Sequence, residues 1–254
     1  MKKLHPHLSL LLIPIHIVWI ASIFLAEINW QAIVAIILLW IIIGGIGLEI
    51  GFHRTLSHKQ FTITPFTEKC ICLLACYSMN GSPTFWRAMH NGYHHPYSDT
   101  KRDFHSPKFN GKFMAYVGYI NNLDKLKYLG CKDIIGDPFY KFVNHYYILI
   151  LWLTLVISGL ISIDLLFILV SAMILCYHQT AMVNTLCHGG NLGYRNFETK
   201  DESKNIQWLA YFTFGQSLHN NHHAFPAKAN YANENHEIDP GYILSKLIRF
   251  KERL

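Results

Sequence analysis

Two long stretches of the chain contain no lysine or arginine, and they constrain the fold more than any other feature. Basic residues are absent from 4–53 and from 142–194, although the chain carries 22 of them among its 254 residues. A helix needs about 20 apolar residues to cross a bilayer, and each stretch is about twice that length. Each stretch therefore predicts a hairpin of two membrane-spanning helices. Glu27 and Asp164, the lone acids of the apolar parts, would mark the turns.

Four membrane-spanning helices follow from these two hairpins. We expect them over residues 8–26, 30–48, 146–161 and 165–183. Neither predicted turn contains lysine or arginine, so every basic residue lies on one side of the bilayer, which the positive-inside rule makes cytoplasmic. The chain is therefore predicted to be an all-α, integral multi-pass membrane protein with both termini in the cytoplasm. Its single domain, 1–254, would hold the two hairpins beneath a cytosolic helical cap formed by 51–145 and 188–254.

The composition argues against several other classes of protein. Charged residues make up 15% of the chain, against about 25% in soluble domains, and the mean hydropathy is +0.18. An ordinary cytosolic domain or a disordered chain would not have these values. A soluble protein with buried hairpins is an alternative, but it does not explain why four apolar segments share one charge asymmetry. A nucleic-acid-binding protein would cluster its basic residues on one arm or face, and this chain does not.

Histidines are the second unusual feature, because the chain has 16 of them, as many as Asp and Glu together. Seven are isolated, and we expect hydrogen-bonded surface or interfacial roles for His5, His7, His16, His105, His145, His178 and His236. The other nine form four clusters beyond the predicted spans: His53 and His58; His90, His94 and His95; His188; and His219, His222 and His223. So many histidines in an apolar chain point to metal, haem or proton chemistry.

Helical spacing predicts which of these rings can converge. At 100° per residue, His219, His222 and His223 occupy one arc of about 100° and can approach one metal region. His53 and His58 lie about 140° apart on an ideal helix. They would converge only if the helix end unwinds, or if they address different metals.

The number of candidate ligands predicts two metal ions. His90 and His94 are expected to share one helix face, as are Asn184 and His188. Nine histidines are more than twice the four ligands that a zinc site needs. They suit two metals with about five positions each, the tenth filled by Asn184 directly or through water. Neutral imidazole binds iron, copper, zinc and nickel.

These motifs resemble those of the membrane-bound fatty-acid desaturases, in the branch that includes stearoyl-CoA and bacterial acyl desaturases. The resemblance extends from the second predicted span to about Pro240. It rests on three histidine motifs, called boxes, which span His53–His58, His90–His95 and His219–His223. Neighbouring segments such as Gly81-Ser-Pro-Thr-Phe-Trp86 also match the family. It implies four spans under a cytosolic cap, a di-iron centre, and oxygen-dependent insertion of a cis double bond into an acyl chain. The ligands it implies are His53, His58, His90, His94, His95, His188, His219, His222 and His223, with Asn184 bound through water.

The sequence departs from the family pattern at two places. The second box is usually HxxHH, which would begin at Asn91, whereas His90 begins HxxxHH. We favour His90, because it follows Trp86 by four residues as the family's box does, and because Gly92 can absorb the extra residue. Gln216 stands where the family usually has an acid before the third box.

The resemblance also implies partners. The substrate would be an acyl-CoA or a membrane lipid, and O2 would be the co-substrate. No cytochrome b5 domain is expected to be fused to the chain. Electrons would then come from a separate ferredoxin or cytochrome b5 type of donor. Residues that bind the substrate are not predicted.

Carboxylates near the boxes could orient the ligands. Glu49 lies one helical turn before His53 and could hold its ring; the alternative is a carboxylate at the membrane interface. Asp99 and Asp103 follow the second box and could accept hydrogen bonds from ligand N–H groups. Two other functions stay open: a hydroxylase or other oxygenase on the same scaffold, and a membrane metal-binding or transport protein. The transport alternative predicts ligands inside the spans.

Overall fold

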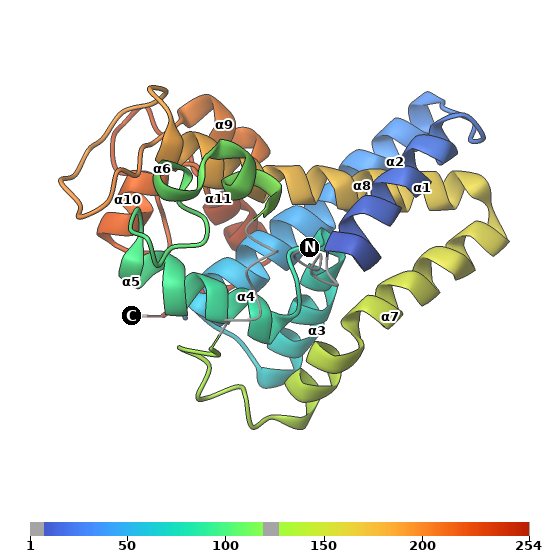
Figure 1. The fold of residues 1–254 in the computed structure, drawn as a ribbon, viewed down its shortest axis with the longest axis horizontal. Coiled ribbons are helices and arrows are strands. Elements are labelled where there is room, and N and C mark those ends of the chain that lie inside the picture. Colours follow the sequence, from blue (N-terminus) through green and yellow to red (C-terminus); the bar gives the residue numbers. More distant parts are fainter. Residues whose placement is uncertain (1–7, 119–126, 254) are drawn as a thin grey trace.

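The computed structural model describes residues 8–118 and 127–253, so His5 and His7 lie outside the described residues. Long apolar helices extend to one side of the molecule, and a group of short helices lies on the other (Figure 1). The apolar elements are η1 (Leu8–Leu12), α1 (Ile13–Ile23), α2 (Trp30–Trp40), η2 (Ile41–Ser57), α7 (Pro138–Ile161), α8 (Ile163–Met182) and η7 (Val183–Cys187). Here η2 and η7 are π-helical continuations of α2 and α8.

Three of these helices are long and apolar enough to cross a membrane. They run over Trp30–Ser57, Pro138–Ile161 and Ile163–Cys187. The first predicted span, 8–26, is shorter than expected, because its helix ends at Ile23 and the apolar helical stretch covers Leu10–Ile23.

The second and third predicted spans are each correct at one end, Trp30 and Ile161, and too short at the other. The helix expected to end at residue 48 continues to Ser57, where its last turns are buried by the cap. The helix expected from 146 begins at Pro138, because the Asp137 side chain accepts a hydrogen bond from the Phe139 main-chain N–H at 2.8 Å and caps it. Proline at the first helical position needs no hydrogen-bond partner for its nitrogen.

The two hairpin turns meet at the same end of the molecule. Asn29 caps α2 through the Ala32 N–H, and Ser162 caps α8 through the Asp164 N–H. The main-chain N–H of Glu27 donates to the Asp164 carboxylate at 2.7 Å. The lone acids of the two apolar stretches therefore lie side by side.

The short helices form the cap. They are α3 (Pro65–Ala75), η3 (Cys76–Ser78), α4 (Pro83–Met89), η4 (His90–His94), α5 (His95–Tyr97), α6 (Pro107–Asn110), η5 (Met114–Gly118), α9 (Gln207–Phe212), α10 (His219–Ala224) and α11 (Pro240–Leu247). One small antiparallel sheet, β1 (Phe61–Thr62) with β2 (Lys251–Glu252), pairs Phe61 with Glu252, a departure from the predicted all-α fold. Helix α3 approaches η2 closely, since a Cβ on Gly47 would lie 3.0 Å from the Ala75 nitrogen.

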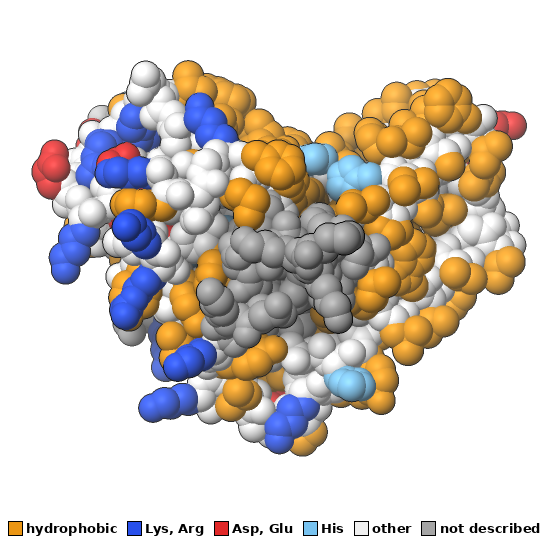
Figure 2. All heavy atoms as spheres, in the orientation of Figure 1, with side chains coloured by type: hydrophobic (Ala, Val, Ile, Leu, Met, Phe, Trp, Pro, Cys, Tyr) orange, Lys and Arg blue, Asp and Glu red, His pale blue; other side chains and the backbone are white. Residues whose placement is uncertain are grey.

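The two halves of the molecule have different surfaces. Hydrophobic side chains cover the long helices, whereas Lys and Arg gather over the cap (Figure 2). Phe24 and Leu160, near the hairpin turns, are 81% and 82% exposed. Soluble proteins rarely expose apolar surface on this scale, so the long helices associate with a membrane.

Candidate metal centre

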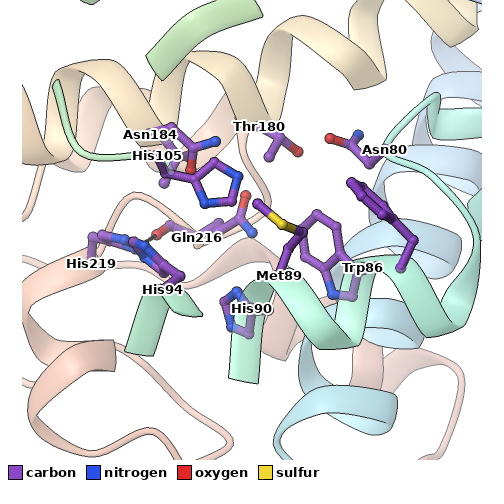
Figure 3. A pocket seen from close by; sticks show the side chains of 12 residues that line it. Asn80, Trp86, Met89, His90, His94, His105, Thr180, Asn184, Gln216 and His219 are labelled. Atoms are coloured by element: carbon purple, nitrogen blue, oxygen red, sulfur yellow. Dashed lines mark hydrogen bonds between the residues drawn. The ribbon is translucent and has the colours of Figure 1, made fainter. Parts of the chain in front are cut away.

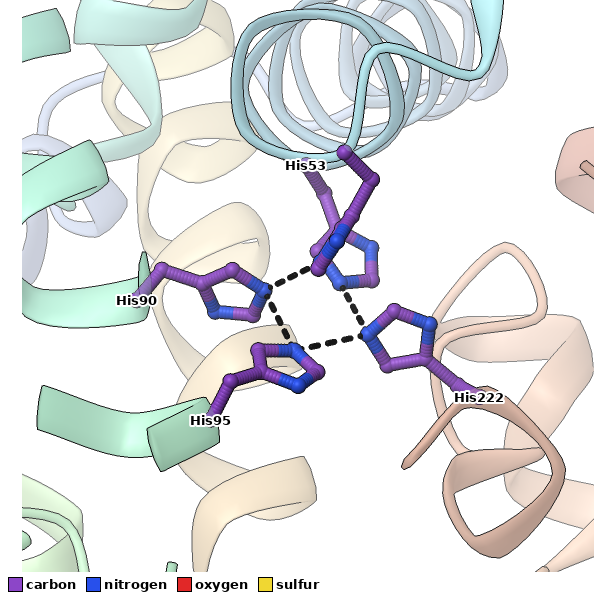
Figure 4. A group of neighbouring side chains, drawn as sticks. His53, His90, His95 and His222 are labelled. Atoms are coloured by element: carbon purple, nitrogen blue, oxygen red, sulfur yellow. Dashed lines mark hydrogen bonds between the residues drawn. The ribbon is translucent and has the colours of Figure 1, made fainter. Parts of the chain in front are cut away.

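Five histidine side chains from three segments converge on one point. Their ligand atoms lie within 4.8 Å of one another. His53 and His222 approach through Nε2 at 3.0 Å, and His58 and His90 at 2.7 Å. His95 Nε2 lies 3.0 Å from both His90 and His222 (Figure 4). We call these five residues the first histidine group.

Four more histidines form the second histidine group: His94, His188, His219 and His223. The Nε2 atoms of His94 and His223 are 3.2 Å apart. The Nε2 atoms of His188 and His219 are buried, and neither has a hydrogen-bond partner within 8–118 and 127–253. The two groups lie side by side, because rings of His94 and His95 are 5.6 Å apart between centroids.

Two π-helical turns explain why the first group converges. The His58 N–H donates to the His53 carbonyl at 3.2 Å, and the His95 N–H donates to the His90 carbonyl. Hydrogen bonds between residues five apart widen the helix and place such residues nearly above one another. His53 and His58 therefore follow the alternative in which they converge, whereas the α-helical spacing was wrong for His90, which joins His95 rather than His94.

Adjacent histidines divide between the two groups. His94 and His95 differ by one residue, and so do His222 and His223, so each pair diverges by about 100° around its helix. His95 and His222 enter the first group, while His94 and His223 enter the second. The third box was expected to converge on one metal region, but its three rings split between the groups.

Carboxylates hold the outer nitrogens of four of the nine histidines, and the sequence suggested three of these carboxylates. Glu49 lies 3.1 Å from His53 Nδ1, and Asp103 lies 3.2 Å from His94 Nδ1. An N–H donated outward to a carboxylate leaves the Nε2 lone pair directed inward, which is the arrangement that metal-binding histidines use.

The second group has two such carboxylates. Asp99 lies 2.9 Å from His188 Nδ1, and Asp201 lies 2.8 Å from His223 Nδ1. Sequence reasoning missed Asp201, because no regular spacing relates it to a ligand 22 residues later. The nearby segment Tyr194-Arg195-Asn-Phe-Glu-Thr199, which also resembles the desaturase family, is the sequence signal nearest to it.

The protonation state of these rings suits metal binding. Burial, together with the neighbouring imidazoles, lowers the pKa of several rings well below the ordinary histidine range: His58, His90, His95, His219 and His222. Burial also lowers the pKa of His223 to about 4. Neutral imidazoles whose lone pairs converge repel one another unless a cation lies between them. The donor set therefore fits two metal ions that accept nitrogen ligands.

A pocket lies between the long helices and both histidine groups (Figure 3). Its apolar lining includes Phe85, Trp86, Met89 and Val183, and its polar lining includes Asn80, His90, His94, His105, Thr180, Asn184, Gln216 and His219. Asn184 Nδ2 and Gln216 Oε1 are buried there without a hydrogen-bond partner in the described part of the chain. These polar atoms are therefore available to a bound water or substrate.

Asn91 lies outside the histidine groups. Its side-chain nitrogen donates to the Ser57 carbonyl at 2.8 Å, whereas His90 Nε2 faces the first group. The geometry supports the register that begins the second box at His90.

Three of the five isolated histidines in the described part of the chain, His16, His178 and His236, have hydrogen bonds as expected. Tyr116 and His178 pair at 2.6 Å, and His236 pairs with the Tyr194 hydroxyl at 3.2 Å. His105 differs, because it lies beside Asp103 and His94 near the second group.

Arg54, inside the first box, anchors the histidine groups to the rest of the cap. The side chain is fully buried, and it donates to Glu49 and to Asp239, both at 2.8 Å. Its guanidinium lies 4.0 Å from the centre of the Tyr231 ring. The sequence pointed to Glu49 but not to Asp239 or Tyr231.

Replacing Arg54 with alanine should destabilise the fold by about 3–5 kcal/mol, because two buried carboxylates would lose their cation. A thermal melt of the detergent-purified protein would measure the loss. Arg102→Ala is the control, since exposed Arg102 only covers the Tyr97 ring, and its melting temperature should not change. Equal melting temperatures for the two variants would contradict the anchoring role of Arg54.

Comparisons with known proteins identify the class to which this site belongs. A family model described as Fatty acid desaturase matches residues 28–233. The sn-1 stearoyl-lipid 9-desaturase of Anabaena variabilis is 30% identical over 249 residues, 95% of this chain and 89% of its own length. Delta-9 acyl-lipid desaturase 2 of Arabidopsis thaliana is 33% identical over 232 residues, 88% of this chain and 73% of its own length.

A third relative is the palmitoyl-monogalactosyldiacylglycerol delta-7 desaturase, chloroplastic, of Arabidopsis thaliana. It is 31% identical over 230 residues, 88% of this chain and 61% of its own length. The chain belongs to the fatty acid desaturase family. It is a fatty-acyl desaturase, an oxidoreductase with a lipid substrate, as the histidine boxes predicted.

Proposed function

We propose that the protein uses two iron ions and O2 to insert a cis double bond into the acyl chain of a membrane lipid. The observation that carries this proposal is the pair of histidine groups, with five and four inward-facing rings. The first group would hold one iron through His53, His58, His90, His95 and His222. The second would hold the other through His94, His188, His219 and His223, with Asn184 acting through a water.

Bound iron would supply the oxidising power that removes two hydrogens from an unactivated CH2–CH2 pair. The net reaction consumes O2, two electrons and two protons, and it releases two waters. The protein's own residues would orient the ligands and exclude bulk water. Glu49, Asp99, Asp103 and Asp201 would keep the Nδ1 protons on the outer side, so that Nε2 stays available.

The pocket between the long helices and the two histidine groups is the proposed position of the reacting carbon pair. Phe85, Trp86 and Met89 give it an apolar wall, and His90 and His219 bring both groups to its other side. An acyl chain held there would lie close to both metals, and positioning of this kind supplies much of the rate of an enzyme.

A lipid-linked acyl chain is the substrate we propose, rather than acyl-CoA. The names of the three relatives describe acyl groups on lipids. Purified protein should therefore desaturate acyl chains of lipid vesicles, and acyl-CoA added alone should give little product.

We propose that four apolar helices form two hairpins in the bilayer, with both turns on one side. The cap, both termini and the metal centre would then be cytoplasmic, as the distribution of basic residues indicates. The shorter first helix, with Leu10–Ile23 apolar, would cross with the help of its flanking residues or a local thinning of the bilayer. The electron donor would be a separate ferredoxin or cytochrome b5 type of protein.

Expression in a host should raise monounsaturated acyl chains only when oxygen and a compatible electron donor are present. Gas chromatography of the lipid fatty acids would measure the product and its geometry. Hydroxylated chains in place of alkenes would assign the protein to the hydroxylase alternative. No new product with oxygen and donor present would contradict the proposed reaction.

The metal content tests the centre separately. Purified active protein should contain about two iron ions per chain, one for each histidine group. Elemental analysis would count them. One zinc or one haem at full occupancy would contradict the di-iron centre. Zinc in both positions would not, because overexpression can load imidazole sites with the wrong metal.

A further inference from the structure

Helices α9 and α11 belong to the cap, yet both contact the second membrane helix within its apolar part. Phe212, the last residue of α9, stacks on Trp40 with ring centroids 5.2 Å apart. Leu244 of α11 packs against Gly45, where an added Cβ would lie 2.8 Å from the Leu244 Cδ2 atom. Both helices therefore lie where the long helices enter the cap (Figure 1).

The position of these contacts along the second membrane helix gives their depth in the bilayer. The helix begins at Trp30, directly after the hairpin turn. At 1.5 Å per residue, Trp40 and Gly45 lie about 15 Å and about 22 Å from Trp30. The hydrocarbon core is about 30 Å thick, and any tilt of the helix makes both depths smaller. Given the proposed two-hairpin topology, on which this step rests, both contacts fall within the hydrocarbon core.

The outward faces of α9 and α11 are apolar. Trp208 and Tyr211 lie three residues apart on α9 and are 60% and 52% exposed. Ile243 and Leu247 lie four residues apart on α11 and are 50% and 74% exposed. Residues at these spacings share one face of a helix. Large apolar side chains exposed in this way fit lipid better than water, and Trp and Tyr are typical of the membrane interface.

A basic segment follows α11. Residues 246–253 contain four basic side chains and one acid, so the net charge of this segment is +3, and all five side chains are exposed: Lys246, Arg249, Lys251, Glu252 and Arg253. The strand within it, β2, pairs with β1, which follows the end of the second membrane helix. The basic segment therefore lies nearer the cytoplasm than the Gly45 contact. Helices that lie in a membrane surface combine an apolar face with basic residues at the head groups.

We infer that α9 and α11 lie in the cap-side leaflet of the bilayer, with their apolar faces among lipid acyl chains and the basic segment at the lipid phosphates. The third histidine box follows α9 closely, since Gln216 lines the pocket and α10 begins at His219. Contact with the lipid therefore fixes the depth of this box, and of the pocket, relative to the acyl chains of the membrane.

A second copy of the chain is the other occupant that could cover these faces. Lipid fits better, because α9 and α11 adjoin Trp40 and Gly45 and so continue the surface of the membrane helices. Two copies that met symmetrically through these faces would also bring two basic segments together, and their like charges would repel each other.

Spin-label accessibility of the protein in lipid nanodiscs tests the inference. Cys70→Ser removes the exposed cysteine, and the other five are buried. Tyr211→Cys or Leu247→Cys, made separately in this background, then takes a nitroxide label. A label in lipid meets dissolved O2 more often than a polar nickel chelate, which hydrocarbon excludes. The ratio of O2 to nickel accessibility at both positions should exceed the ratio at a water-facing control by about fivefold or more.

Phe225→Cys is the matched control. Phe225 is also apolar and 50% exposed, but it follows α10 at the end of the cap away from the long helices (Figure 1). Ratios at 211 and 247 as low as the ratio at 225 would overturn the inference, because both faces would then meet water. Exclusion of both reagents at 211 and 247 would also overturn it and indicate a second copy.

A label at Leu38→Cys tests the topology on its own. Leu38 is exposed on α2, within the apolar part of the second membrane helix. Its ratio of O2 to nickel accessibility should be as high as the ratios at 211 and 247. A low ratio at position 38 would contradict the proposed topology itself, and the placement of α9 and α11 in the leaflet would fall with it.

Discussion

Replacing His222 with alanine should abolish desaturation while the protein still folds and inserts into the membrane. His222 Nε2 lies 3.0 Å from both His53 and His95, near the centre of the first histidine group. Removing a group that hydrogen-bonds to a metal-binding side chain typically lowers metal affinity or activity by about 10–100-fold. Loss of the ligand itself should therefore reduce activity by more than about 100-fold. Fatty-acid profiling of a host that expresses the variant would measure the effect.

Metal content should distinguish a lost ligand from a damaged fold. The second histidine group does not use His222, so the variant should fall from two metal ions toward one. His145→Ala is the control, because exposed His145 contacts Tyr146 and belongs to neither group. It should keep its activity and both metals. Full activity in His222→Ala would remove the third box from the site.

The sequence predicted the three apolar helices that are long enough to cross a membrane, because charge and hydropathy act along the chain. Helix ends were less predictable, since burial by distant segments decides them. The helix through His53 continues to Ser57 because the cap surrounds its last turns. A span length counted from the bilayer alone cannot include this effect.

The histidines of the site were found from their clustering, but their division into two groups was not. An α-helical angle is the wrong guide where hydrogen bonds join residues five apart. The bond from the His95 N–H to the His90 carbonyl is such a case. This bond directs the His95 ring toward the first group, while the His94 ring belongs to the second.

The carboxylates that contact the histidines and Arg54 could also be predicted only where the spacing along one helix places them. Glu49 precedes His53 by one helical turn, and that spacing alone predicted their contact. Asp201 and Asp239 reach His223 and Arg54 across segments distant in sequence. Only the packed fold brings such groups together, because no periodicity of the chain relates them.

The second histidine box offers a direct test of the π-helical turn. His90→Ala should lose activity and at least one metal, because His90 Nε2 lies 2.7 Å from His58 and 3.0 Å from His95. Asn91→Ala should keep both metals and most of its activity. Its side chain donates to the Ser57 carbonyl, and a hydrogen bond of this kind contributes about 0.5–1.5 kcal/mol to stability.

A result in which Asn91→Ala loses metal and His90→Ala keeps it would establish the shorter register and leave eight histidine ligands. Physical chemistry argues against that result. An amide oxygen is a harder and weaker ligand for iron than imidazole, so the shorter register would replace a good ligand with a poor one. The π-helical turn explains how the longer box is tolerated. One extra residue between His90 and His94 is absorbed by the wider turn, and His90 and His95 still face the same histidine group.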